Sequence, residues 1–252
     1  MWQNKLKDTL TFCLGIVLIG VVVQAAGALK GDALVFPGVD EIMRAFFRLI
    51  TAEKTYALIW TTMKHLIAAM AVSAVIGVAL GMAMGMLPFL RKLLQPMMIL
   101  LRSLPMVILI VIIMVVADYA HVPVLASSIV LVPMIAEAAC EGCLRIDKEF
   151  IDVYRMNANF NGRVLFQVYL PLMAGYLRQA WVTAAGMGVK LAVSTEYLVQ
   201  TKNSLGKAVH TSGYFNEYQD IYAYALVMIL LVLVVSEGPV MIRKLAACMR
   251  KK

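Results

Sequence analysis

Long apolar runs separated by short polar or basic segments dominate the chain. Several runs reach the roughly 20 residues that a helix needs to cross a hydrocarbon core about 30 Å thick. No run alternates with a period of two, and all exceed the segments of about 10 residues typical of outer-membrane barrels. The pattern predicts an all-α polytopic membrane protein with six transmembrane helices. These are Thr9–Leu29, Tyr56–Met86, Leu93–Ala117, Pro123–Leu144, Leu172–Tyr197 and Ile221–Ile242.

Composition supports this class and excludes others. Of the 252 residues, 62% are hydrophobic and 15% are charged, whereas soluble domains average about 45–50% and about 25%. A soluble enzyme, a secreted disulfide scaffold and a disordered chain are therefore set aside. Cys140 and Cys143 form a C-x-x-C, but no second pair or nearby histidine completes a zinc set, so we predict a structural role and no metal site.

The net charge of +8 reflects basic residues that flank the apolar runs. If the N-terminus is cytoplasmic, thirteen of the 23 Lys and Arg residues fall on the cytoplasmic side and six on the outer side. The positive-inside rule then places both termini in the cytoplasm. The basic tail, residues 245–252, is an orientation signal and not a nucleic-acid patch.

The first apolar run has two interpretations. Residues 1–35 are expected to hold a retained transmembrane helix, because the apolar run Leu10–Ala26 exceeds the 7–15 residues or so of a signal-peptide core. Cleavage as a signal peptide stays open at this stage.

Two loops are expected to contain helices of their own. In residues 36–55, the segment Glu41–Ile50 is amphipathic and is expected to lie along the outer membrane interface. In residues 145–171, apolar and polar side chains interleave on either side of Asn161-Gly162, and Leu170-Pro171 precedes the fifth helix. This second loop predicts a short cytoplasmic helix, a turn and a re-entering membrane helix.

The 145–171 loop resembles the cytoplasmic signature of the membrane permease subunits of bacterial ATP-binding-cassette importers. That signature reads Glu-Ala-Ala, three residues, Gly, nine residues, Ile, one residue, then Leu-Pro. The chain keeps the spacing with Asp152-Val153-Tyr154, Ala158, Val168 and Leu170-Pro171. Three substitutions separate the chain from the signature: Asp for Glu, Val-Tyr for Ala-Ala, and Ala for Gly. The match therefore lies in the spacing and in the kind of residue, more than in residue identity.

Further matches, over about residues 36–244, resemble the nitrate, sulfonate, taurine and bicarbonate branch of these permeases. They are Phe36-Pro37, Thr61-x-x-Lys64, Arg102-x-x-Pro105, the segment Val193–Leu198, and Leu205-Gly206 before the last helix. Their order and spacing together carry the resemblance.

The resemblance implies a transport subunit of the bacterial inner membrane with its transmembrane domain over residues 56–244. Its partners would be ABC ATPase subunits that bind the ATP, a second permease copy, and an extracytoplasmic solute-binding protein. The residues expected to couple to the ATPase are Asp152, Tyr154, Arg155, Ala158, Leu170 and Pro171.

The chain itself shows no nucleotide site. Gly206-Lys207 lacks the upstream glycine and the following Ser or Thr of a P-loop, and Gly186-Met187-Gly188 lacks the third glycine of a dinucleotide site. We therefore expect neither enzymatic activity nor a cofactor in this chain.

Small residues recur every four positions in the second predicted helix, at Ser73, Gly77, Gly81 and Gly85. They place one continuous strip on one helix face, which permits close helix packing. The pattern does not say whether a neighbouring helix or another subunit fills that groove.

Placing an ionisable side chain inside a membrane helix costs free energy, so each such residue is expected to have a structural or functional role. Glu137 and Lys190 are the deepest, and they either pair across the bundle or face a wet path. Glu137, Lys190, Ser194 and Glu196 are our candidates for a translocation path or gate.

The predicted function is that of an importer permease that takes a small anion of the sulfonate, nitrate or taurine kind, or a pyrimidine precursor. An ATP-independent secondary transporter or channel is the alternative, although no inverted repeat or broken helix of the kind expected there is evident.

Overall fold

The computed structural model describes residues 37–147, 149 and 164–249, and every regular element within them is a helix. The elements are α2 (Val39–Thr51), α3 (Glu53–Met86), α4 (Pro88–Ser103), α5 (Met106–Val116), α6 (Val122–Leu144), the π-helical turn η1 (Leu165–Tyr169), α9 (Leu170–Val199), α10 (Leu205–Tyr214) and α11 (Tyr218–Met249). The all-α class predicted from the sequence is confirmed.

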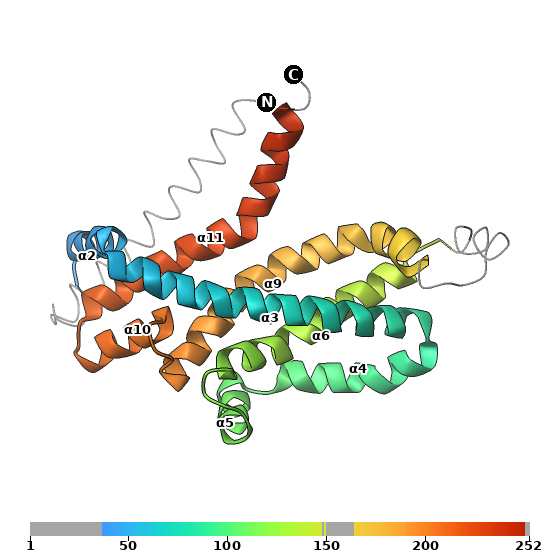
Figure 1. The fold of residues 1–252 in the computed structure, drawn as a ribbon, viewed down its shortest axis with the longest axis horizontal. Helices are drawn as coiled ribbons and strands as arrows, with labels where there is room; N and C mark the ends of the chain where they lie inside the picture. Colours follow the sequence, from blue (N-terminus) through green and yellow to red (C-terminus); the bar gives the residue numbers. More distant parts are fainter. Residues whose placement is uncertain (1–36, 148, 150–163, 250–252) are drawn as a thin grey trace.

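The long helix α3 runs between the two ends of the molecule (Figure 1). One end holds α2, α10 and the last turns of α9, and we call it the α10 end. At the other end, α6 finishes and α9 begins, on either side of residues 145–169, and we call it the loop end.

Four predicted helices correspond to α3, α6, α9 and α11, although α11 continues to Met249 where the apolar pattern predicted Ile242. The prediction Thr9–Leu29 lies outside the described residues. Among the described helices, α3, α6 and residues Tyr218–Ser236 of α11 are long and apolar enough to cross a membrane, and the α4–α5 pair makes a fourth if it counts as one span. The count of six stays a prediction.

The predicted single helix Leu93–Ala117 is wrong, because the chain bends by 100° between α4 and α5. Leu104 has an extended backbone and Pro105 begins α5 as its N-cap. Proline clashes with a helical conformation of the preceding residue, which ends α4 at Ser103. The result is two short helices in place of one continuous helix.

The small-residue strip of α3 packs against α6. A Cβ added to Gly77 would lie 2.9 Å from Cβ of Ile135, and a Cβ at Gly81 or Gly85 would overlap atoms of α6 as well. Ser73 donates a hydrogen bond to the carbonyl of Ser128 at 3.4 Å. The partner of the strip within this chain is therefore a neighbouring helix.

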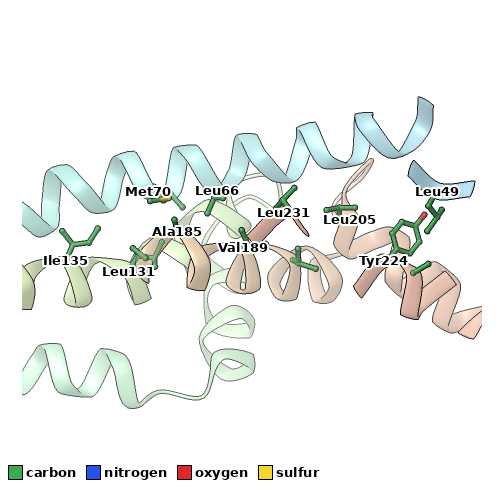
Figure 2. Packing of buried hydrophobic residues seen from close by; sticks show 14 of the residues in the cluster. Leu49, Leu66, Met70, Leu131, Ile135, Ala185, Val189, Leu205, Tyr224 and Leu231 are labelled. Atoms are coloured by element: carbon green, nitrogen blue, oxygen red, sulfur yellow. The ribbon is translucent and has the colours of Figure 1, made fainter. Parts of the chain in front are cut away.

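The core continues from this contact toward the α10 end. Figure 2 shows Leu66 and Met70 of α3 facing Leu131 of α6 and Val189 of α9, with Leu205 of α10 further along. All five are buried. The core therefore fixes the relative positions of α3, α6, α9 and α10.

The amphipathic segment Glu41–Ile50 lies within α2. Ala45 and Leu49 on one face are buried, while Arg48 forms an ion pair with Asp220 of α11. The apolar face of α2 therefore packs on the helical bundle at the α10 end.

Candidate functional site

A fully buried glutamate lies at the centre of the α10 end. Glu196, in the last turn of α9, has an exposed fraction of 0%. Its Oε2 accepts a hydrogen bond from the hydroxyl of Thr62 at 2.8 Å, and its Oε1 lies 2.7 Å from Nδ1 of His65. Because a carboxylate only accepts, Nδ1 of His65 donates in this contact.

The same carboxylate also reaches the first turn of α10. The backbone N–H of Gly206 donates to Oε2 of Glu196 at 3.3 Å, and that of Leu205 donates to Oγ1 of Thr62 at 3.1 Å. We call Thr62, His65, Glu196, Leu205 and Gly206 the Glu196 cluster. It connects α3, α9 and α10 through side chains of α3 and α9 and backbone N–H groups of α10.

The cluster satisfies backbone donors that a helix start leaves unpaired. The N–H of Lys207, next in line, donates to the Ser204 side chain at 3.2 Å. A carboxylate is also favoured at a helix N-terminus, where the helix dipole is positive. The beginning of α10 is therefore held by groups from two other helices as well as by its own N-cap.

Gly206 allows this close approach. A Cβ at this position would lie 2.5 Å from Cβ of Glu196, from the backbone N of Tyr197 and from the carbonyl O of Val193. Two of these three atoms belong to the backbone of α9 and cannot rotate away. Only glycine fits here without moving α9 or α10.

A tight turn brings the chain from α9 back to this contact. Gln200 closes α9 in a left-handed conformation with φ 54°, and Asn203 has the same φ. Beside the turn, the rings of Tyr197 and His210 pack edge to face with centroids 5.1 Å apart. These contacts place α10 across the end of α9.

Glu196 was predicted as a candidate for a translocation path or gate, but its partners Thr62 and His65 were not predicted. Thr62 and His65 are three residues apart, so they share one face of α3. Two polar residues on the same buried face were a signal that a polar partner lies opposite.

Glu137 does not pair with Lys190, because it has a different partner. Glu137 of α6 forms an ion pair with Arg102 in the last turn of α4. Both side chains are partly exposed, at 39% and 48%. Glu137 therefore ties α4 to α6 and does not contact Lys190.

Lys190 and Ser194 lie on the exposed side of α9, away from the Glu196 cluster. They border a hollow of about 440 Å³ together with Val193, Tyr197 and Leu198 of α9 and Met228 of α11. In the part of the chain that the structure describes, Lys190 has no hydrogen-bond or ion-pair partner. Lys190 and Ser194 are thus brought together, whereas Glu137 and Glu196 serve separate contacts.

Of the predicted coupling residues, Asp152, Tyr154, Arg155 and Ala158 lie outside the described residues. Leu170 and Pro171 open α9 directly after η1. Proline has no N–H to leave unpaired there, which suits a helical first turn.

The cysteines of the C-x-x-C lie in the packed interior of α6. Sγ of Cys143 lies 2.9 Å from Sδ of Met173 in α9, and Cys140 packs near Met84 and Met98. Among the described residues, no group of three or more His, Cys, Asp or Glu side chains is placed to hold a metal ion.

Comparison with known proteins identifies a family and a similar fold. The model of the family described as "Binding-protein-dependent transport system inner membrane component" matches residues 73–236. A solved structure of the MetNI methionine ABC transporter, in inward-facing conformations, contains a chain similar to this one. Its TM-score is 0.60 at 18% identity, over 74% of this chain and 94% of that chain, which is a likeness of fold alone. No curated protein matches the sequence.

Proposed function

Because the chain belongs to the family of inner membrane components of binding-protein-dependent transport systems, we propose that it is the permease subunit of an ATP-driven importer. One observation carries the proposal: the family match over residues 73–236 includes the whole loop that keeps the permease signature spacing. The likeness in fold to a chain of an ABC transporter agrees with it.

In this proposal the loop end faces the cytoplasm and receives the ATPase. Asp152, Tyr154, Arg155 and Ala158 make the contact, and Leu170-Pro171 passes the movement to α9. The continuous helix of 30 residues that follows η1 supports such a transfer. The basic tail lies on the same side, in a bacterial inner membrane.

The α10 end would then face outward, toward a solute-binding protein. Full burial of Glu196 and its contacts to two other helices support a role in holding the outer gate, and argue against direct contact with solute. Lys190 and Ser194 are the candidates for the path itself, and a second copy of the chain would complete that path.

The substrate is a small anion of the sulfonate, nitrate or taurine kind, or a pyrimidine precursor. The second candidate function is an ATP-independent transporter or channel. The 100° break between α4 and α5 is the observation that keeps it in view, because broken helices are common in such carriers.

The test is affinity purification of the tagged full chain in mild detergent from cells that express its native partners. We expect a P-loop ATPase to co-purify with the wild type and to be lost with Asp152→Arg. The control is Glu53→Arg, the same charge reversal in the exposed first turn of α3 at the opposite end, which should retain the ATPase. Absence of any ATPase from the wild type would favour the ATP-independent transporter.

A further inference from the structure

One face of α9 is polar along most of its length. Taking 100° per residue, five side chains fall within about 60° of one another on the helical wheel. These are Gln179, Thr183, Lys190, Ser194 and Tyr197, and all five are exposed. We call them the Lys190 face. The opposite side of the helix carries buried residues, among them Ala184, Gly188, Ala192 and Thr195.

This polar face distinguishes α9 from the other long helices. With 30 residues it is longer than α6, yet it is not among the described helices that are apolar enough to cross a membrane. α9 packs between α3, α6 and α11, so it lies within the membrane-embedded bundle. A polar face in that position needs water or a polar partner beside it.

Lys190 lies well within the length of α9 and not at its end. It lies nine residues before the last residue of α9, or about 13 Å along the axis at 1.5 Å per residue. Side chains on a helix tilt toward its N-terminus, which directs Lys190 away from the α10 end and further into the membrane. With Glu137 held by Arg102, no described acidic group neutralises the Lys190 charge.

The hollow beside Lys190 indicates what could neutralise it. The wall of the hollow is largely apolar and is formed by Val193, Leu198 and Met228. The hydroxyl-bearing residues Ser194 and Tyr197 complete it. Its volume of about 440 Å³ suits a small organic molecule. One cation in an apolar wall matches a molecule that has one negative group and an apolar body.

We propose that Lys190 binds the negative group of an organic anion, a sulfonate or a carboxylate with a short apolar body, on the translocation path along the Lys190 face. The proposal rests on the proposed transport function and narrows its substrate. It favours an organic anion over nitrate, which has no apolar part, and over an uncharged pyrimidine, which would leave Lys190 unpaired.

The first experiment tests water and charge on this face without knowledge of the natural substrate. Ser194→Cys is made in the full chain after the four native cysteines are replaced, and the protein is reconstituted in nanodiscs with its partners. The thiol is reacted with two methanethiosulfonate reagents, one bearing a sulfonate and one a trimethylammonium group. Both reagents need water, so reaction at this position reports a wet path.

We expect the sulfonate reagent to react faster than the cationic reagent. Because Lys190 and the thiol at position 194 lie one helical turn apart, Lys190→Met should lower the rate of the sulfonate reagent about tenfold relative to that of the cationic reagent. Lys190→Arg should retain the preference, which also shows that the site tolerates substitution. Lys64→Met, on α3, should leave the ratio unchanged, and Val75→Cys, exposed on the apolar side of α3, should not react. No reaction at Ser194→Cys, or a ratio that is insensitive to Lys190→Met, would overturn the proposal.

The second arm identifies the anion. Butane-1-sulfonate should protect Ser194→Cys, while nitrate and butanol should not, and protection should disappear with Lys190→Met. Nanodiscs of zwitterionic and of anionic lipid separate a solute site from a lipid headgroup site. Protection by anionic lipid but not by butane-1-sulfonate, or equal protection by nitrate, would contradict the proposal.

Failure here is separable from failure of the transport function. If the ATPase co-purifies but Ser194→Cys does not react, only the Lys190 site is wrong. If labelling and protection succeed while no ATPase is found, the anion site stands and the ATP-driven mechanism falls.

Discussion

Glu196 and Glu137 both lie within long helices of the bundle, yet the protein accommodates them in opposite ways. Glu196 is fully buried and is held by a hydroxyl, an imidazole and a backbone N–H. Glu137 is partly exposed and is paired with a single arginine. The first arrangement fixes three helices, whereas the second joins two helices by a contact that solvent or headgroups can screen. We therefore expect the same kind of substitution to have very different costs at the two sites.

The largest effect is expected for Glu196→Ala. The change leaves the buried Thr62 hydroxyl, the His65 ring and the Gly206 N–H without their acceptor, which should lower the free energy of unfolding by about 3–5 kcal/mol. Titration of the detergent-solubilised protein with SDS, followed by tryptophan fluorescence, measures this loss. Glu196→Gln keeps the volume and one acceptor, so it should cost less than half as much. Equal losses for both variants would show that volume matters here and hydrogen bonding does not.

Gly206→Ala should come next. The added methyl would meet backbone atoms of α9, and the required shift should cost about 1–3 kcal/mol in the same titration. Gly175→Ala is the matched control, because α9 offers open space around that position. Alanine also suits a helix better than glycine, so the control should be neutral or more stable by up to about 1 kcal/mol. A stable Gly206→Ala protein would mean that α10 is not held as closely as the cluster implies.

Arg102→Met should have the smallest effect, at most about 1 kcal/mol, because the Arg102–Glu137 pair is partly exposed. A double-mutant cycle with Glu137→Gln measures the coupling between the two side chains directly. A coupling above about 2 kcal/mol would contradict the contrast drawn with Glu196, and would indicate that membrane or a partner subunit buries this pair.

The sequence predicted the parts of the fold that depend on local pattern. Tyr56–Met86, Pro123–Leu144 and Leu172–Tyr197 were continuous apolar runs, and each corresponds to one helix. The α4–α5 bend was missed because apolar residues continue across it. Pro105 was the available signal, since the residue before a proline rarely stays helical.

The full Glu196 cluster could not be predicted from the local sequence pattern. Thr62 and Glu196 are 134 positions apart, and only the packing of α3 against α9 brings them together. The apolar pattern predicted no helix between Tyr197 and Ile221, because the segment that forms α10 is short and polar. Ser204 caps α10 locally, but the acceptors for the Leu205 and Gly206 N–H groups come from α3 and α9, and no single window of sequence contains them.

The glycine strip of α3 has a consequence for motion. Where two helices approach so closely that a methyl group does not fit between them, there is no free volume for one to slide along the other. We therefore expect the pair α3–α6 to move as one rigid body. We expect any opening and closing of the molecule to be taken up elsewhere, at breaks such as the 100° bend between α4 and α5 and the short connection between α9 and α10.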